Sequence, residues 1–435
     1  MKKLFWGGIH PKTQKEMSGS YENISLIEPE EVVIPLSQHI GAPCVPLVKV
    51  GDSVCMGQKI GDGEGLCVPV HASVSGTVTA VEMLPHTNGM KVLSIVIKND
   101  YKYTWHQMVK AGNLYQGVMR AEELFSVIRE AGIAGMGGAA FSSAVKAKSA
   151  YENIDTLIIN ACECEPYITA DEALICTEPE QVLKGISHIG KVLKPKKIVL
   201  AIEDNKKQAI EVLKKYLDGK PQISLNVMPT RYPQGAEKQL IKAVTGRELP
   251  PGQLPVSVNC AVFNVSTASA IGQAVCEGIP VVRRIVTVTG EAVENPQNFL
   301  VPIGTKFSVL VEAAGGLRKN VQKVIAGGPM MGRAQESLEV PVIKGTGAVL
   351  CLPEEPVVAS TDCIRCGKCV EVCPMNLQPL YLYRYGKSGD LSMLEELYMT
   401  DCMECGCCTY VCPAKLPLVE VFREGKRALK EGKAK

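Results

Sequence analysis

Two copies of one cysteine pattern near the carboxyl end of the chain carry its clearest chemistry. Each copy has three cysteines spaced three residues apart, then a fourth cysteine followed by proline. The copies are Cys363-x2-Cys366-x2-Cys369-x3-Cys373-Pro374 and Cys402-x2-Cys405-x2-Cys408-x3-Cys412-Pro413. In the bacterial two-cluster pattern, each triplet binds one [4Fe–4S] cluster and the fourth cysteine binds the other cluster. The spacing therefore predicts two [4Fe–4S] clusters.

The same rule assigns each cysteine to a cluster. The first set is Cys363, Cys366, Cys369 and Cys412, and the second is Cys402, Cys405, Cys408 and Cys373. A zinc site would use four cysteines in two pairs, which leaves the third cysteine of each triplet and the Cys-Pro unexplained. Cys407 lies outside the pattern, and we expect it to be a packed free thiol.

The composition is that of an ordinary globular protein. Its 435 residues predict roughly three domains, and 46% apolar with 21% charged residues is typical of soluble chains. A net charge of +2 does not indicate nucleic-acid binding. No apolar stretch has the length of a transmembrane helix or a signal peptide. We therefore expect a cytoplasmic protein in a reducing compartment, or one held at a membrane only by partners.

A glycine-rich loop interrupts two predicted helices. The helix over 121–131 ends at Gly132, and a second helix carrying Lys146 follows Phe141. Within this loop Gly135-x-Gly137-x-x-Ala140 matches the dinucleotide fingerprint, but that fingerprint follows a strand and this loop follows a helix. Glycines still let backbone N–H groups approach a phosphate or a flat ring. The loop indicates such a site, with a tight helix–helix turn as the alternative.

The middle of the chain alternates strands and helices. Strands over 156–160, 198–202 and 223–227, with helices over 179–193 and 205–217, predict a doubly wound α/β fold. Ligands of such folds lie beyond the carboxyl ends of the strands. The acidic loop over 161–166 follows a strand at such an end. Its two cysteines lack further metal ligands, so we expect them to be small loop residues.

Both flanks of this region are rich in short strands. Short alternating strands begin at Glu31, and the stretches over 50–60 and 69–81 resemble the two halves of a lipoyl-like sandwich. The hairpin tip has no lysine, which favours a structural module. The stretch over 283–316 fits a compact β-grasp unit. We expect Met330 and Met331, which follow it, to fill core space. The basic tail over 421–435 is expected to be a helix with a solvated face.

Taken together, these features resemble the RnfC family, the NADH-oxidising subunit of the membrane Rnf ferredoxin:NAD oxidoreductase. The resemblance covers nearly the whole chain, and its central part also resembles the flavoprotein subunit of respiratory complex I. Besides the doubled cysteine run, it is carried by Gly7-Gly8-Ile9-His10-Pro11, Pro35-Leu36-x-Gln38-His39-Ile40-Gly41-Ala42-Pro43, the loop over 132–141, Asn160-Ala161-Cys162-Glu163-Cys164-Glu165-Pro166-Tyr167 and Tyr232-Pro233-x-Gly235-x-Glu237-Lys238.

This resemblance implies a multidomain α/β protein. The expected parts are an N-terminal arm over 1–30, a lipoyl-like barrel-sandwich domain over 31–100, a Rossmann-like FMN/NADH domain over 118–282, a soluble-ligand-binding β-grasp (SLBB) domain over 283–352 and a ferredoxin-like α domain with two [4Fe–4S] clusters over 353–435. Hydride transfer is expected at FMN itself, with no catalytic side chain.

The resemblance also places cofactor-binding residues. Those expected around FMN are Gly135, Gly137, Gly138, Lys146, Asn160, Glu163, Gly235, Asn264 and Thr267. Those expected along NADH are Phe141, which would stack on it, Glu165 and Glu237. The chain departs from the complex I pattern at Met136, Cys162, Cys164, Ala236 and Phe263, where complex I has Arg, Asp, Ser, Glu and Asn. These departures bear on the phosphate contacts and on nucleotide affinity.

The implied function is electron exchange between NAD(H), FMN and two clusters, coupled through the complex to Na⁺ or H⁺ translocation. The implied partners are the other Rnf subunits, including integral membrane subunits and a ferredoxin-like subunit, and the implied location is the cytoplasmic face of the membrane. Two alternatives stay open. One is a related NADH flavoprotein of the cobalamin-reductase or proline-reductase kind, and the other is a non-catalytic iron–sulfur scaffold.

Overall fold

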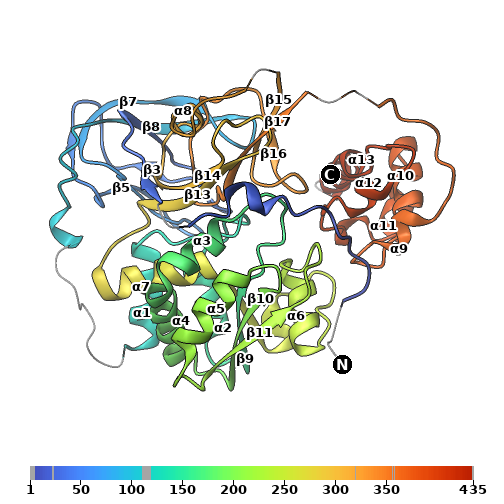
Figure 1. Ribbon diagram of the computed structural model, residues 1–435, viewed down its shortest axis with the longest axis horizontal. Coiled ribbons are helices and arrows are strands. Elements are labelled where there is room, and N and C mark those ends of the chain that lie inside the picture. Colours follow the sequence, from blue (N-terminus) through green and yellow to red (C-terminus); the bar gives the residue numbers. More distant parts are fainter. Residues whose placement is uncertain are drawn as a thin grey trace.

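The computed structural model describes residues 5–21, 24–109, 119–318, 320–354, 356 and 358–433. The first four residues of the predicted arm, position 118 at the predicted start of the FMN/NADH domain, and the last two residues of the predicted tail lie outside these ranges. Figure 1 shows the α/β part in green and yellow, the strand-rich parts above it, and a helical part in red at one side.

The first strand-rich part is a sandwich of two antiparallel sheets. One sheet has the order β2–β8–β7–β4 and the other the order β3–β5–β6. Alternating apolar residues such as Val32, Ile34 and Ile97 face inward and are fully buried. The elements are β2 (Glu31–Pro35), β3 (Val45–Pro46), β4 (Ser53–Val54), β5 (Lys59–Asp62), β6 (Val70–His71), β7 (Gly76–Pro85), β8 (Lys91–Asn99) and the 3-10 turn η2 (Gln107–Val109).

The α/β part is built on a parallel sheet with the order β11–β10–β9–β12. Leu157, Ile158 and Ile159 of its central strand are fully buried, because helices cover both faces. The predicted doubly wound fold is confirmed. Its strands are β9 (Thr156–Ala161), β10 (Lys197–Glu203), β11 (Ile223–Met228) and β12 (Cys260–Asn264). Its helices are α1 (Ala121–Glu130), α2 (Ser143–Ala150), α3 (Ala170–Thr177), α4 (Pro179–Leu193), α5 (Lys207–Leu217), α6 (Glu237–Thr245), η3 (Pro255–Val258) and α7 (Val265–Glu277).

Helices α4 and α7 touch backbone to backbone at two glycines. A Cβ atom on Gly185 would overlap the carbonyl of Ala268, and one on Gly272 would lie 2.8 Å from the amide nitrogen of Gly185. We expect Gly185→Ala to destabilise the protein by about 3 kcal/mol, since overpacking at a backbone contact cannot be relieved by a rotamer change. The urea midpoint measures this.

A helical glycine elsewhere provides the control for that substitution. The Cβ position of Gly432 lies 3.8 Å from its nearest neighbour, an ordinary contact. Gly432→Ala should therefore leave the midpoint unchanged or raise it slightly, because alanine has the higher helix propensity. Equal effects of the two substitutions would show that the α4–α7 contact is not close.

The second strand-rich part is a mixed sheet with the order β1–β14–β13–β17–β15–β16. Phe307 and Leu310 of its helix α8 are fully buried, which fits the expected β-grasp unit. The elements are β1 (Ser25–Leu26), β13 (Arg283–Thr289), β14 (Gln297–Pro302), α8 (Phe307–Ala313), β15 (Val321–Ala326), β16 (Arg333–Gln335) and β17 (Ala348–Pro353).

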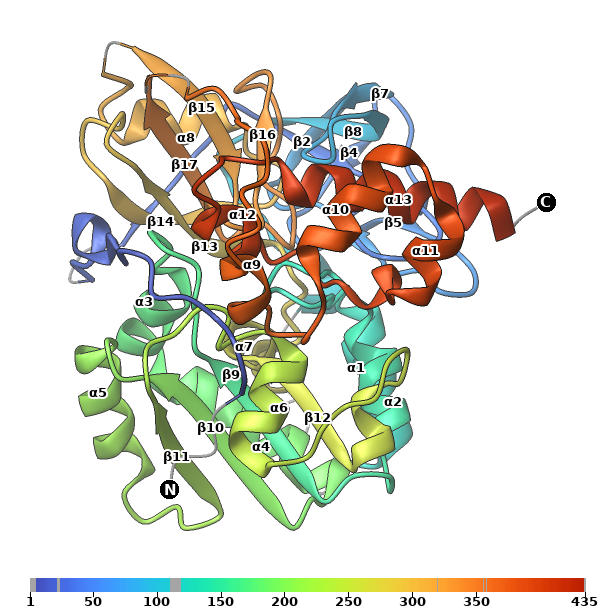
Figure 2. The ribbon, with the colours of Figure 1, turned by 90° about the vertical axis from the view of Figure 1, so that its right-hand side faces the viewer.

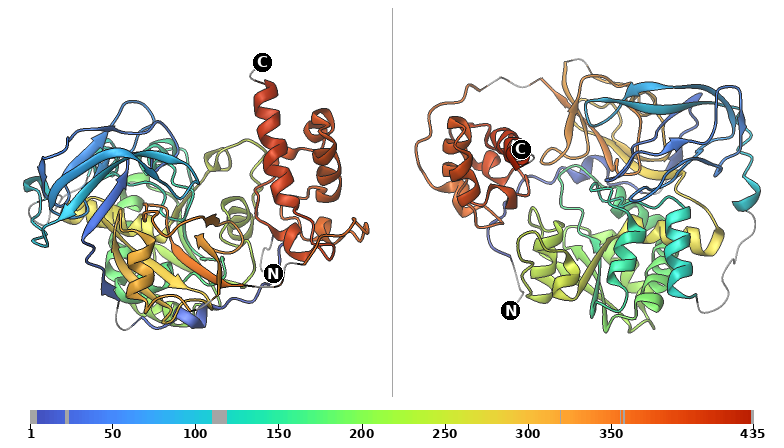
Figure 3. Two further views of the ribbon diagram at one scale, coloured as in Figure 1. Left: turned by 90° about the horizontal axis from the view of Figure 1, so that it is seen from above. Right: turned by 180° about the vertical axis from the view of Figure 1, so that it is seen from behind.

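The carboxyl-terminal part is helical and lies at one side of the molecule in both views of Figure 3. Its core is formed by Leu382, Leu394, Met399, Leu418 and Phe422. The elements are α9 (Lys368–Glu371), α10 (Pro379–Ser388), α11 (Leu391–Glu396), the 3-10 turn η4 (Met399–Asp401), α12 (Cys407–Val411) and α13 (Leu418–Lys433).

The N-terminal arm touches three of these parts. Gly8 donates its N–H to the carbonyl of Val372 at 2.8 Å, and Ile9 pairs with Tyr232 as an isolated β-bridge. After the turn η1 (Lys15–Ser18), β1 pairs in parallel with β14. Figure 2 follows this dark blue segment across the molecule. The arm therefore connects the helical part, the α/β part and the mixed sheet.

Among the helices that the structure describes, none combines the length and the apolar character needed to cross a membrane.

Candidate functional site

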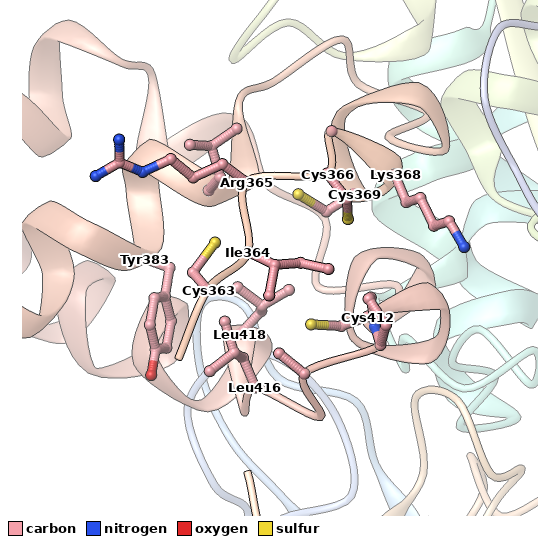
Figure 4. Close-up of a pocket in the computed structure, with 14 residues that line it drawn as sticks. Cys363, Ile364, Arg365, Cys366, Lys368, Cys369, Tyr383, Cys412, Leu416 and Leu418 are labelled. Carbon is pink, nitrogen blue, oxygen red and sulfur yellow. The ribbon is translucent and has the colours of Figure 1, made fainter. Parts of the chain in front are cut away.

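The first predicted cysteine set lines one cavity in the helical part. Figure 4 shows Cys363, Cys366, Cys369 and Cys412 arranged around a common space, with Ile364 among them. Cys363 and Cys366 come from the segment that leads into α9, Cys369 lies within α9, and Cys412 follows α12. The fold thus brings the last cysteine of the second run to the triplet of the first.

The second set lines a second cavity in the same way. Its walls include Cys402, Cys405, Cys408 and, from the first run, Cys373. Cys407 also lines this cavity and is fully buried, as predicted. Among the described residues no three metal-binding side chains meet closely enough to hold a single ion. Each cysteine set lines a cavity. Soft thiolates around such a space suit an iron–sulfur cluster.

The two cavities differ in their distance from solvent and from the rest of the chain. Cys363 and Cys366 of the first set are exposed, whereas Cys405 and Cys408 of the second are buried. The Tyr232 hydroxyl of the α/β part donates to the carbonyl of Cys405 at 2.8 Å. The second cavity therefore faces the α/β part, and the first lies toward the surface.

The glycine loop rests on the start of α7. The Thr267 hydroxyl accepts the N–H of Met136 at 2.9 Å. Asn264 caps α7 by accepting the N–H groups of Ser266 and Thr267 at 2.9 and 3.2 Å. A Cβ atom on Gly137 would lie 3.2 Å from the Asn264 side chain, so glycine permits this close approach. Three predicted site residues thus meet here.

The outer edge of this loop is open. Gly138 has φ +107°, and nothing lies within 4 Å of where its Cβ would stand. Within the described chain the N–H groups of Gly137 and Gly138 donate no hydrogen bond. The loop closes on itself at Phe141, whose carbonyl accepts the N–H of Gly135 at 2.8 Å. Unpartnered backbone donors beside open space fit a phosphate or a flavin ring.

The remaining predicted residues come from several elements. Asn160 lies near the carboxyl end of β9, with Glu163 and Glu165 in the loop that follows, whereas Lys146 lies in α2, Gly235 just before α6 and Glu237 at the start of α6. The Asn160 amide donates to the carbonyl of Gly235 at 2.8 Å. The Lys146 ammonium donates to Glu237 at 2.8 Å and to the carbonyl of Val262 at 3.0 Å. These contacts bring the two halves of the sheet edge together, where ligands of such folds bind.

Asp171 is a buried carboxylate that the sequence did not single out. It accepts the Asn264 amide at 2.6 Å and the Ser266 hydroxyl at 2.5 Å, and its own N–H donates to Glu163 at 2.7 Å. Burial raises the pKa values of both Asp171 and Glu163. The signal was hidden because α3 has polar residues on its buried face and so lacks an amphipathic pattern.

The arm supplies a second unpredicted residue, Lys15. Its buried ammonium donates to the carbonyls of Glu163 and Glu165 at 2.9 Å, and to that of Ile168. Burial, together with repulsion from Lys206, lowers the pKa of Lys15 to about 8. Lys15 therefore fixes the acidic loop that follows β9.

Glu165 is turned toward the mixed sheet. Its carboxylate accepts the N–H groups of Met330 and Met331 at 3.1 and 2.8 Å. The prediction that both methionines fill core space is wrong for Met331, whose side chain is 46% exposed. The loop stays at the surface because its backbone is bound to Glu165 instead of burying its side chains.

The pH dependence of stability tests the environment of Glu165. Burial raises its pKa from 4.5 to about 7, against the opposing hydrogen bonds from Met330 and Met331. Between these values the folded protein keeps a proton that the unfolded chain has lost, so stability falls as pH rises from about 4.5 to 7. Glu165→Gln keeps an acceptor for the N–H groups and should remove roughly 3 kcal/mol of that fall. If the unfolding midpoints of wild type and Glu165→Gln changed in parallel between pH 4.5 and 7, the raised pKa of Glu165 would be contradicted.

Four family models match the chain. They are the Nuo51 FMN-binding domain over residues 128–273, the RnfC barrel sandwich hybrid domain over 3–102, the SLBB domain over 285–334 and the 4Fe-4S dicluster domain over 362–416. The expected FMN-binding and dicluster parts are confirmed by these matches.

Similar solved structures were found for an NAD+-reducing [NiFe]-hydrogenase. In its H2-reduced state, that protein has a TM-score of 0.49 and 19% identity, with 75% of this chain and 63% of the hydrogenase chain covered.

Several C subunits of ion-translocating oxidoreductase complexes are similar to this chain over nearly its whole length. The C subunit of the Na(+)-translocating ferredoxin:NAD(+) oxidoreductase complex of Acetobacterium woodii is 43% identical over 387 residues, which cover 88% of this chain and 87% of the relative. The proton-translocating counterpart of Clostridium ljungdahlii is 40% identical, and the match covers 92% of this chain and 88% of the relative. The corresponding protein of the ion-translocating oxidoreductase complex of Serratia proteamaculans is 40% identical, covering 88% of this chain and 55% of the relative. The chain belongs to the RnfC family, one of the component families of ion-translocating ferredoxin:NAD(+) oxidoreductase complexes.

Proposed function

We propose that this chain is the NAD(H)-binding subunit of an Rnf complex. In this function it exchanges electrons between NAD(H) and two [4Fe–4S] clusters by way of FMN. The complex couples ferredoxin:NAD(+) oxidoreduction to the translocation of Na⁺ or H⁺. The proposal rests on family membership together with the FMN-binding and dicluster matches.

One structural observation carries the proposal. A hydrogen bond from Tyr232 to the carbonyl of Cys405 joins the α/β part to the second cysteine cavity. The Gln239 amide adds a contact to the carbonyl of Pro374 at 3.0 Å. These two contacts join the second cysteine set to the α/β part that carries the glycine loop, whereas Cys363 and Cys366 of the first set are exposed to solvent. This order is what an electron path from a nucleotide to a partner requires.

We assign the cluster ligands as predicted, with the fourth cysteines of the two runs exchanged. The first cluster takes Cys363, Cys366, Cys369 and Cys412, and the second takes Cys402, Cys405, Cys408 and Cys373. Bound FMN would supply the exchange of one hydride for two single electrons. The open N–H groups of Gly137 and Gly138 would hold it, and Asn264 with Thr267 would keep the loop in place.

The nicotinamide nucleotide is assigned to the space beside the glycine loop, next to the FMN position. Phe141 would stack on it, while Glu237 and Glu165 would line it. In this structure Glu165 is occupied by two backbone N–H groups, so its role there is to shape the wall beside the nucleotide. No side chain is assigned a proton-transfer step.

The proposal extends to partners, location and domain boundaries. The partners would be the other Rnf subunits, including integral membrane subunits and a ferredoxin-like one, with the chain held peripherally at the cytoplasmic face. The boundaries predicted from the sequence belong to this proposal as well. Co-purification of membrane subunits with a tagged chain from its native host would support it, and tagged protein recovered without them from gently solubilised membranes would contradict it.

Catalysis by the isolated chain is the direct test. Purified protein is expected to contain FMN and to reduce an artificial dye with NADH. A protein that carries clusters but neither retains nor rebinds FMN, and does not oxidise NADH, would overturn the proposal in favour of a scaffold.

A further inference from the structure

The motif over 35–43 in the sandwich part, which includes Ile40, has no role in the proposed electron transfer. In the structure this motif reaches the glycine loop. The N–H of Ile40 donates to the carbonyl of Ala140 at 3.0 Å. The sandwich and the proposed FMN loop are therefore in direct backbone contact, although about a hundred residues separate them in the chain.

The Ile40 N–H is held in place from both sides. The N–H of Ala42 donates to the carbonyl of Leu66 at 3.0 Å, and the N–H of Val68 donates to His39 at 3.1 Å. Gly41 has φ +143°, and a Cβ atom there would overlap the Leu66 carbonyl. Segment 39–42 is thus hydrogen-bonded to segment 66–68, which fixes the direction of the Ile40 N–H.

The acceptor of this bond is a strained residue. Ala140 has φ +50°, in the left-handed region that costs a non-glycine residue about 1 kcal/mol. Such conformations persist where their surroundings hold them, and they gather at functional sites. The N–H of Ala140 donates to Gly135 at 3.1 Å, and its carbonyl is held by Ile40. The sandwich therefore helps to maintain the turn that leaves the N–H groups of Gly137 and Gly138 open.

The other end of the glycine loop is connected to the sandwich through Lys344, which lies between β16 and β17 of the mixed sheet. The buried ammonium of Lys344 donates to the carbonyls of Gly132 and Pro69 at 2.7 and 2.5 Å. The N–H of Lys344 donates to the Gln38 side chain at 3.1 Å. Both ends of the loop are thus fixed to the sandwich, one directly and one through Lys344.

We propose that the barrel-sandwich domain positions the FMN-binding glycine loop, with Ile40 and Gln38 as its positioning residues. The inference rests on the proposed function and deepens it. The domain then contributes to flavin affinity without touching the reacting atoms.

Paired substitutions separate the Ile40 N–H from its side chain. Ile40→Pro removes the N–H, and Ile40→Ala keeps it. Apoprotein titrated with FMN should show about ten-fold weaker binding for Ile40→Pro, the effect of losing one well-placed hydrogen bond. Ile40→Ala should bind within two-fold of wild type. At saturating FMN, the kcat of Ile40→Pro for NADH-dependent dye reduction should return to within two-fold of wild type, which a general structural defect would not allow.

Two further variants control for folding. Leu47 is 56% exposed and Ile40 is 55% exposed, and the N–H of Leu47 donates to Ile60 inside the sandwich at 2.8 Å. Leu47→Pro should therefore leave FMN affinity unchanged. Gln38→Leu removes the acceptor for the Lys344 N–H and should weaken FMN binding about three-fold. If Ile40→Pro does not fold, the FMN affinity of Gln38→Leu tests the positioning role instead.

The outcomes separate the positioning role of the sandwich from the proposed function of the chain. Wild-type FMN affinity in Ile40→Pro, or in Gln38→Leu when Ile40→Pro is unfolded, overturns the positioning role alone. Equal weakening by Leu47→Pro and Ile40→Pro also overturns it. Wild-type protein that cannot bind FMN overturns the proposed function and this inference with it.

Discussion

Replacing Cys412 with alanine should remove the same cluster as replacing Cys363, although the two residues belong to different cysteine runs. Both line the first cavity. Each variant is expected to lose about half of the iron, roughly four of eight atoms per chain. Their EPR spectra after reduction should match one another and retain only the signal of the second cluster.

The reciprocal pair completes this test. Cys373→Ala and Cys402→Ala should share the opposite spectrum, because both residues line the second cavity. Cys407→Ala is the matched control, since Cys407 lines that cavity without being assigned as a ligand, and it should keep all the iron. If Cys412→Ala instead matched Cys402→Ala, each run would bind its own cluster and the exchange of ligands would be wrong.

Asn264→Ala should abolish FMN retention while leaving both clusters in place. The substitution removes the cap of α7, leaves Asp171 without its amide donor and takes away the side chain against Gly137. Loss of a cap and an unpaired buried carboxylate together are expected to cost about 2 kcal/mol or more, so FMN affinity should fall at least about 30-fold. FMN content and fluorescence titration measure this.

A second cap separates flavin binding from general stability. Asp390 caps α11 in the helical part by accepting the N–H of Met393 at 3.1 Å. Asp390→Ala should lower the unfolding midpoint and keep FMN. Stoichiometric FMN in Asn264→Ala would show that the α7 cap does not support the flavin site.

The doubled cysteine run shows how much spacing alone can predict. The exchange of Cys373 and Cys412 between the two sets was expected from the pattern, and the fold places each beside the other triplet. The pattern works because three thiolates at short spacing lie on one short segment of chain, so only the fourth position depends on tertiary structure. The amphipathic helix α1 and the buried strand β9 were predictable for a similar reason, since their periodicity is local.

Residues joined over long distances could not be predicted in this way. Lys15 lies about 150 positions from the carbonyls that it binds, and a lone lysine in a turn-rich arm gives no periodic signal. The same holds for Ile40, whose backbone contact with Ala140 has no side-chain signature. Asp171 was hidden because its helix buries polar side chains. In each case the partner, and not the local sequence, gives the residue its role.

The central claim is that electrons pass from NADH through FMN to the iron–sulfur clusters within this one chain. The most direct measurement is an anaerobic titration of the FMN-loaded protein with NADH, followed by visible absorption and EPR. We predict that NADH bleaches the flavin absorption and then produces the EPR signal of at least one reduced cluster, and that Cys373→Ala removes the signal assigned to the second set. Clusters that stay oxidised with excess NADH, although dithionite reduces them, together with unbleached flavin, would contradict the account.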